Sequence, residues 1–169
     1  MALTTTNPAL LQAGSDRAFR VFLHEFLAFA SRLEAIRTGF ATRLKLSGAA
    51  YTTLIALAQL ERDQAEIGVT ALAEHLHVSA AFVTTEIGAL TRRRLVQKRP
   101  HPRDGRRVIL GLTPRGQALL ASLLPVQAPV NNALFASLDA ASFQHLAALL
   151  PRLIADADHA LALLKEPAP

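Results

Sequence analysis

The side chains in this sequence that are best suited to chemistry are a run of cations in its middle. Between Thr91 and Arg107 the chain has eight basic residues and a single acid, Asp104, a net charge of +7. The rest of the chain, with ten basic and twelve acidic residues, has a net charge of −2. Such a concentration is suited to binding the phosphates of a nucleic acid, although an isolated run of this kind is as often a solvated surface. The basic residues are Arg92, Arg93, Arg94, Lys98, Arg99, Arg103, Arg106 and Arg107.

The sequence offers little for catalysis or for metal binding. It has no cysteine, which excludes disulfides, thiolate metal ligands and thiol-based redox sensing. It also lacks a Gly-x-Ser-x-Gly motif, a phosphate-binding glycine loop and paired carboxylates on one face, so we expect no catalytic residue, no cofactor and no enzymatic activity. His75 and His77 are near neighbours, but no cluster of further ligands accompanies them. We therefore expect no metal site and rank a metal sensor as a minor alternative.

The segments around the basic run have the pattern of a DNA-binding fold. Two short helices are expected at about 70–76 and 79–92, with Thr70 and Ser79 as their N-caps and only two or three residues between them. Two strands are expected after them, and the prolines and the Asp104-Gly105 pair between these strands predict a hairpin tip. A helix-turn-helix followed by a hairpin is a winged helix-turn-helix, whose second helix can enter the major groove of DNA.

Long helices are expected on both sides of this module. From Asp16 the apolar residues recur in alternating steps of three and four over about seven turns, which predicts one long helix with a single apolar seam. Because such a helix would extend beyond a small domain, we expect the seam to pack against a second copy of the chain. Packing within its own domain is the alternative. The seam begins with Phe19, Phe22 and Phe26. Ala- and Leu-rich residues after the hairpin predict further helices, the last of them capped by Asp139.

Length and composition set the class of protein. A chain of 169 residues with 51% hydrophobic residues is expected to fold into one domain, or into one domain with an oligomerisation arm, and its apolar content argues against disorder. No apolar stretch approaches the ~20 residues that span a bilayer, and no basic segment precedes an apolar run at the start, so we expect a cytoplasmic protein without membrane contact. We predict a mainly α-helical fold with a small β-hairpin wing. Its parts are a flexible arm at 1–14, a winged helix-turn-helix at 46–114 and a helical dimerisation region at 15–45 and 115–166.

In this order of motifs the sequence resembles the MarR (multiple antibiotic resistance regulator) family of bacterial transcription factors. The residues that carry the resemblance are Leu46-Ser47, Tyr51, Val69–Leu76, Val78-Ser79, Val83-Thr84, Leu90, Leu95-Val96, Arg103–Arg107 and Leu112–Gly116. The resemblance implies a homodimer with interlocking terminal helices that binds double-stranded DNA at a palindromic operator and often responds to a small aromatic or phenolic ligand. The sequence departs from the family at Arg94, where a glycine usually ends the second helix. We expect Arg94 to adopt the left-handed conformation at a cost of about 1 kcal/mol.

The second helix of the module, the recognition helix, has unusual side chains for contacting DNA. Its outward residues include no Arg, Lys, Asn or Gln, the side chains that read guanine or adenine through two hydrogen bonds. Its hydroxyl groups can make single bonds to bases or phosphates, and its alanine and phenylalanine side chains can contact thymine methyl groups. For Phe82, partial burial is an equal alternative. The residues expected to contact DNA are Ser79, Ala80, Ala81, Phe82, Thr84 and Thr85.

The wing is expected to supply the positive charge. The resemblance implies that Arg106 at the hairpin tip enters the minor groove, and a narrow A·T-rich groove favours such insertion. Asp104 carries a negative charge, which the phosphates of DNA repel, so we expect it to pair with neighbouring arginines. Together with Gly105 it is expected to shape the tip. The other cations expected at the DNA are Arg92, Arg93, Lys98, Arg99, Arg103 and Arg107.

The resemblance also implies an effector pocket between the dimerisation helices and the winged module. Arg20 and His24 lie one turn apart on the first helix, and Ser47 and Tyr51 lie one turn apart at the start of the second. These four residues are candidates for binding a small aromatic acid or its coenzyme A thioester, with solvated or ion-paired arginines as the alternative. The favoured interpretation is a repressor that such a ligand releases from DNA. A winged-helix protein-interaction module and a regulator without an effector are the alternatives.

Overall fold

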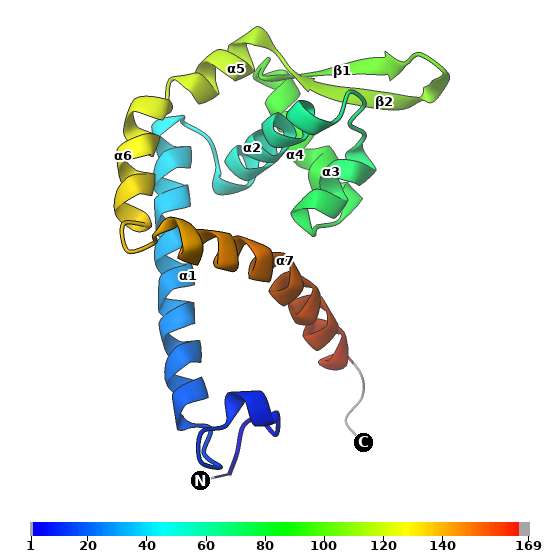
Figure 1. The fold of residues 1–169 in the computed structure, drawn as a ribbon. Coiled ribbons are helices and arrows are strands. Elements are labelled where there is room, and N and C mark those ends of the chain that lie inside the picture. Colours follow the sequence, from blue (N-terminus) through cyan, green and yellow to red (C-terminus); the bar gives the residue numbers. More distant parts are fainter. Residues whose placement is uncertain (1, 166–169) are drawn as a thin grey trace. The chain divides into compact units, whose positions relative to one another are not determined.

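The structure is a computed structural model that describes residues 2–165, apart from the side chains at positions 105 and 106. The chain divides into two compact units, Met1–Pro125 and Val126–Pro169, and each is described by itself. Helices account for most of the described residues, and the sheet among them is a two-stranded antiparallel hairpin (Figure 1). The predicted fold class, mainly α with a small β-hairpin wing, is therefore confirmed.

The first unit contains the helix-turn-helix and the wing. Its elements are the short 3-10 helix η1 (Pro8–Leu10), the helices α1 (Arg17–Arg43), α2 (Gly48–Asp63), α3 (Val69–Leu76) and α4 (Ala80–Arg92), the strands β1 (Val96–His101) and β2 (Asp104–Leu112), and the helix α5 (Pro114–Ala121). Helix α6 (Leu124–Leu134) begins where this unit ends, and α7 (Ala140–Leu163) lies in the second unit.

Helix α2 is the centre of the first unit. It packs against α1, α3, α4, α5 and β2. The apolar stripe that the sequence predicts on α4, formed by Val83, Ile87 and Leu90, is fully buried in this core. The other large, fully buried apolar side chains are Leu54, Leu57, Ile67, Leu72 and Val96. The helix-turn-helix and the base of the wing thus share one core, which fixes the recognition helix relative to the hairpin.

Serine hydroxyl groups cap the N-termini of α2 and α4. The Ser47 hydroxyl accepts a hydrogen bond from the backbone N–H of Ala50 at 3.1 Å at the start of α2. The Ser79 hydroxyl accepts from the N–H of Phe82 at 3.2 Å and begins α4. Such caps satisfy N–H groups that have no partner inside the helix.

The predicted cap of the first short helix is wrong. Thr70 lies inside α3, and the N-cap is Gly68, which makes no side-chain cap bond. The reason is a contact distant in sequence: Ile67 forms an antiparallel bridge with Leu110 of β2 and keeps the chain extended up to Gly68. The chain turns into the helix directly afterwards.

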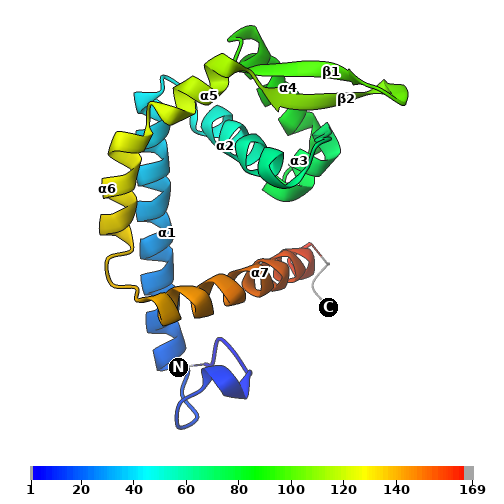
Figure 2. The same ribbon diagram turned by 45° about the horizontal axis from the view of Figure 1, so that its top comes forward.

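The hairpin is longer and its turn is tighter than the sequence predicts. β1 and β2 pair from Val96 opposite Leu112 to His101 opposite Asp104, with an irregularity just before His101. The turn consists of Pro102 and Arg103, so Asp104 opens β2 and does not form the tip. In both views the hairpin projects away from the helices of its own unit (Figures 1 and 2).

The joint between α4, the wing and α5 explains why a threonine and a glycine occupy positions 113 and 116 in the segment Leu112–Gly116. Arg94 has a φ of 59°, the left-handed conformation expected for it. The Thr113 hydroxyl donates to the Arg94 carbonyl at 2.7 Å and accepts from the Gly116 N–H at 3.0 Å. A Cβ atom at Gly116 would lie 2.2 Å from the carbonyl oxygen of Leu95, so only glycine fits there.

The long helices of both units carry exposed apolar side chains. On α1, Phe22 is 56% exposed and Phe26 is 42% exposed, whereas Phe19 is half-buried. On α7, whose N-cap is Asp139 as predicted, no residue is buried and Phe143 is 60% exposed. In the part of the chain that the structure describes, no helix combines the length and the apolar character needed to cross a membrane.

The residues before α1, predicted to be a flexible arm, are attached to that helix through one carboxylate. The backbone N–H and the hydroxyl of Thr4 both donate to Oδ2 of Asp16 at 2.7 Å. Arg20 donates to the same oxygen through Nε at 3.0 Å, and its Nη2 donates to the carbonyl of Ala2 at 2.8 Å. These bonds, that of the Thr4 backbone first, lower the pKa of Asp16 to about 2.

Candidate nucleic-acid interface

The recognition helix is presented by a turn of two residues. His77 has a φ of 52°, the left-handed conformation, and the N–H of Val78 donates to the carbonyl of Ala73 at 3.0 Å. This geometry ends α3 and allows Ser79 to cap α4 immediately afterwards. The buried stripe of α4 faces the core, so its opposite face is open to solvent. Phe82, to one side of the open face, is 39% exposed, so it is partly buried and still accessible to a partner.

The hairpin carries most of the exposed cations. Lys98 and Arg99 on β1 and Arg107 on β2 are exposed, which agrees with their predicted role at the DNA. Arg106 and Gly105 lie in β2, but their side chains fall outside the described residues. The predicted minor-groove contact of Arg106 and the predicted shaping of the tip by Gly105 therefore remain predictions.

Two of the predicted DNA contacts make bonds within the protein. Nη1 of Arg93 donates to the carbonyl of Lys45 at 2.6 Å and so attaches the end of α4 to the junction between α1 and α2. Nη2 of Arg103 lies 3.7 Å from Oε1 of Glu66. Both side chains are still exposed to solvent, but each is held close to the protein.

A buried histidine attaches the wing to the residues before α3. His101, at the end of β1, is 8% exposed, and its Nε2 lies 2.9 Å from Oε2 of Glu66. Its Nδ1 accepts the backbone N–H of Arg103 at 3.2 Å. Because Nδ1 must accept, the neutral ring carries its proton on Nε2 and donates it to the carboxylate. We call this group, formed by Glu66, His101 and Arg103, the wing clasp.

Two further bonds hold the base of the wing. The N–H of Leu110 donates to the carbonyl of Ile67 at 2.8 Å, and the N–H of Leu112 donates to Oε1 of Glu61 at 2.7 Å. β2 therefore gains part of the hydrogen bonding that a third strand would give it. The cations of the wing are held at a defined place beside α4.

Sequence reasoning missed the residues that position the wing. From the sequence alone, Glu61 and Glu66 are interpreted as polar residues at the end of α2, and His101 is interpreted as a histidine in a loop. Their partners lie 35 residues away for the Glu66–His101 pair and 51 residues away for the Glu61–Leu112 bond. The single signal in the sequence was the position of His101 between two prolines in an otherwise cationic segment.

The four predicted effector residues lie in different surroundings. Arg20 binds Asp16, and the Ser47 hydroxyl caps α2. Tyr51 is 5% exposed and packs its ring 6.4 Å from that of Phe40, and burial raises the pKa of its phenol. His24 lies exposed on α1. Their role in binding an effector therefore stays a prediction.

A different arginine lines a cavity between α1, α2 and the helix-turn-helix. This cavity has a volume of about 320 Å³, and its lining residues are Arg37, Ala49, Thr52, Leu76, Val78 and Phe82. Arg37 donates through Nη1 to the carbonyl of Gly48 at 2.6 Å and to the Thr52 hydroxyl, and through Nε to Glu34 at 2.6 Å. Hydrogen bonding between the two lowers the pKa of Glu34 and raises that of Arg37. One cation thus faces an otherwise apolar space.

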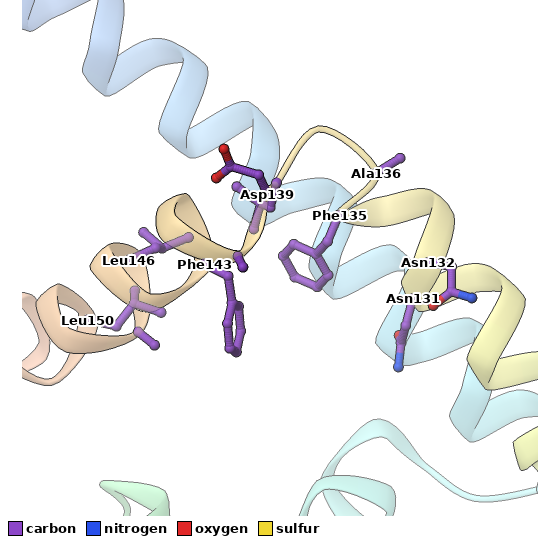
Figure 3. Close-up of a pocket in the computed structure, with 11 residues that line it drawn as sticks. Asn131, Asn132, Phe135, Ala136, Asp139, Phe143, Leu146 and Leu150 are labelled. Atoms are coloured by element: carbon purple, nitrogen blue, oxygen red, sulfur yellow. The ribbon is translucent and has the colours of Figure 1, made fainter.

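The second unit has a larger cavity without a comparable cation. It has a volume of about 710 Å³ and lies where α6 meets α7. Phe135 and Phe143 lie along it together with Leu146 and Leu150 of α7 (Figure 3). Its carboxylate, Asp139, accepts the N–H of Ser142 at 2.7 Å as the cap of α7. The charge needed to bind an anion is therefore absent from the residues that line this cavity.

Comparison with known proteins identifies the module. Residues 44–107 match the sequence model of the MarR family. No curated protein sequence matches the chain significantly. Within the described residues no group of three side chains is placed to bind a metal ion.

Solved structures resemble the chain over most of its length. BpsR of Bordetella bronchiseptica, whose DNA binding is regulated by 6-hydroxynicotinic acid, is 26% identical with a TM-score of 0.62, over 85% of this chain and 94% of BpsR. A probable transcriptional regulator from Pseudomonas aeruginosa is 26% identical with a TM-score of 0.58, over 78% of this chain and 96% of that one. A mutant MarR from E. coli, solved with operator DNA, has the same fold with a TM-score of 0.63 and 21% identity, over 77% of this chain and 91% of that one.

Proposed function

We propose that this protein is a ligand-released repressor whose winged helix-turn-helix belongs to the MarR family of DNA-binding transcriptional regulators, which are not enzymes. It acts in the cytoplasm as a homodimer on a palindromic operator. The observation that carries the proposal is the pairing of an open recognition helix with a cationic hairpin that the wing clasp and the bond of Glu61 hold beside it.

The homodimer is supported by the exposed apolar seam of α1. The ring centroids of Phe22 and Phe26 lie 5.9 Å apart in a tilted arrangement, yet the two side chains are 56% and 42% exposed in the single chain. Burial of one such side chain stabilises an interface by roughly 1.5–3 kcal/mol. A second copy with the same seam would cover both, and a two-fold axis would match two recognition helices to two half-sites of a palindrome.

The cations divide into two proposed roles. Lys98, Arg99 and Arg107 are exposed on the hairpin and would neutralise phosphates. For Arg106 we keep the minor-groove contact that the family resemblance implies. Arg92 lies on the exposed side of α4 near its end and would reach the backbone flanking the major groove.

The effector is proposed to be a single-ring aromatic acid bound in the Arg37 cavity. A cavity of about 320 Å³ is at the small end of ligand sites, which suits a free acid better than its coenzyme A thioester. The carboxylate would replace Glu34 on the guanidinium of Arg37, and the ring would lie against Val78 and Phe82. Since those two residues flank the start of α4, ligand binding would move the recognition helix relative to α1. The acid that regulates BpsR belongs to this chemical class.

DNA binding is tested by selection from a random duplex library with the full-length chain. The proposal predicts enrichment of a palindrome bound by two chains per duplex, as measured by sedimentation. No enriched sequence, or a complex with one chain, contradicts it. Failure to bind DNA combined with capture of a specific protein would instead favour the winged-helix interaction module.

Effector binding is tested by thermal shift with 6-hydroxynicotinic acid and hydroxybenzoic acids. A ligand present at about 100 times its Kd stabilises the native state by about 2.7 kcal/mol, so the melting temperature must rise. Arg37→Gln and Arg37→Lys should abolish the shift, because neither keeps the two-pronged bond to a carboxylate. Arg32→Gln on the same helix, where Arg32 donates to its own backbone at Ala28, is the matched control. No shift with any acid would favour a regulator without an effector.

A further inference from the structure

The hydroxyl groups on the recognition helix are already committed as donors. Thr84 donates its hydroxyl proton to the carbonyl of Ala80 at 2.8 Å, and Thr85 donates to the carbonyl of Ala81 at 3.1 Å. A hydroxyl that donates within the helix presents only its lone pairs and its γ-methyl group to the outside. Using either proton for DNA would first break an intrahelical bond.

The exposed side of α4 consequently offers acceptors and methyl groups but no side-chain donor over its first two turns. We call Ala81, Phe82, Thr84 and Thr85 the reading face; all four are exposed, and Ala81 and Thr85 lie opposite the buried stripe of Val83, Ile87 and Leu90, with Phe82 and Thr84 to either side. Ser79 keeps a proton, but it sits at the N-cap, where phosphates bind. Arg92, the nearest cation on this side, is at the last position of the helix.

The base pairs differ in the chemical groups that their major-groove edges present to such a face. Guanine presents two acceptors, N7 and O6, which find no donor here and would be left unpaired. An A·T pair presents the N6 amino group of adenine, which a threonine oxygen can accept, beside the 5-methyl group of thymine, which a γ-methyl or the ring of Phe82 can cover.

We propose that the recognition helix reads A·T pairs through the 5-methyl group of thymine and the amino group of adenine, and makes no hydrogen bond to guanine. This inference rests on the proposed DNA-binding function and specifies the base chemistry of its half-site. Thr85 is the central specificity-determining residue, because it lies farthest from the buried stripe. Its oxygen and its methyl group have separate roles.

The test uses chemically altered DNA. The palindrome selected with the wild-type chain is resynthesised with deoxyuridine in place of thymidine, which removes only methyl groups, or with 7-deazaguanine in place of guanine, which removes the N7 acceptor. We expect deoxyuridine to weaken binding about 4-fold for each methyl group buried. We expect 7-deazaguanine to change the affinity less than 2-fold, whereas a two-bond contact to guanine would make it fall about 5-fold or more.

Two variants of one residue separate the methyl group from the oxygen. Thr85→Ser keeps the oxygen and loses the methyl group, so part of the deoxyuridine effect should disappear. Thr85→Val keeps the methyl group and loses the oxygen, so the deoxyuridine effect should remain while the preference for adenine relaxes. Thr91→Val, which removes a hydroxyl that donates to Ile87 at 2.7 Å about two turns beyond the reading face near the end of α4, serves as the matched control.

The outcomes distinguish this inference from the proposed function. Tight, salt-sensitive binding that ignores deoxyuridine, or that weakens 5-fold or more with 7-deazaguanine, overturns the inference and leaves the regulator intact. In the second case Arg92→Ala would identify the donor. Failure to enrich any duplex overturns both.

Discussion

The winged module and the long helix α1 are both rich in apolar side chains but differ in what covers them. In the module, Leu54, Leu72 and Ile87 are 0% exposed. On α1, Phe22 is 56% exposed and Phe26 is 42% exposed, although both belong to a regular seam. The module completes its core within one chain, whereas the seam has a pattern that needs a second helix. An apolar periodicity therefore shows that one face of a helix will be buried. It does not show whether the same chain or a second copy will cover that face.

The largest effect expected is on the seam. Phe26→Asp places a charge on a surface that a second copy must cover, so the dimer should dissociate while the monomer keeps its helices. Loss of the second half-site should weaken binding to a palindrome about 10²–10⁴-fold. Sedimentation and gel shift measure the two effects. Phe26→Leu, the apolar control, should leave both nearly unchanged. A Phe26→Asp variant that still dimerises would place the interface elsewhere.

The next largest effect comes from the same substitution, glycine to alanine, made once in the winged module and once on α1. Gly116→Ala forces a Cβ against the backbone carbonyl of Leu95 and should destabilise the module by about 3 kcal/mol, as overpacked cores do. Gly39→Ala on α1 meets nothing within 4 Å in the chain and should stabilise the helix by about 0.5–1 kcal/mol. Chemical denaturation gives both values. If the two variants changed the unfolding free energy equally, the contrast between the packed module and the open helix α1 would be wrong.

A smaller effect is expected for the bonds that hold the wing. Glu66→Gln removes the charge that faces His101 and Arg103 in the wing clasp. Glu66 is 41% exposed, so solvent screens the pair and the expected loss of unfolding free energy is about 1 kcal/mol. DNA affinity should fall as well, because the hairpin is held less firmly. A variant with unchanged stability and affinity would show that Glu61 and Ile67 position the wing alone.

The wing cations should act additively and weakly. Replacing Lys98 or Arg99 by Gln should lower the slope of log affinity against log salt by about 0.9 for each phosphate that the variant no longer neutralises. Arg152→Gln, an exposed cation on α7, is the matched control and should leave the slope unchanged. If Arg152→Gln lowers the slope as much as Arg99→Gln, the charge of the wing has no special role.

The smallest effect concerns the residues before α1. The pKa of Asp16 is lowered to about 2 in the folded chain from 3.8, so the bonds to Thr4 stabilise the native state above about pH 4 and are lost as the pH falls toward 2. The amide resonance of Thr4 should titrate with a midpoint near 2, and Asp16→Asn should abolish this titration. A midpoint near 3.8 would show that Thr4 does not bind Asp16.

The sequence predicted the parts of the fold that depend on local chemistry. Ser79 and Asp139 cap their helices, and Arg94 is left-handed, because these choices depend on residues within a few positions of each other. Thr70 failed as a cap because the bridge between Ile67 and Leu110 sets where α3 begins, and that contact spans the whole module.

The candidate site was predictable in its charges and not in its internal partners. Lys98, Arg99 and Arg107 are exposed as expected, since a dense cationic run cannot be buried. The bonds of Arg93 to Lys45 and of His101 to Glu66 join residues 48 and 35 positions apart, so no spacing rule could find them. The Arg37 cavity was missed for the same reason, because its lining comes from four helices.

The central claim, that the cations of one short segment bind DNA, is tested most directly by the salt dependence of affinity for the selected palindrome. If a dimer neutralises six to ten phosphates, affinity should fall about 10³–10⁵-fold between 50 and 200 mM salt. An affinity that stays constant across this range would contradict the claim.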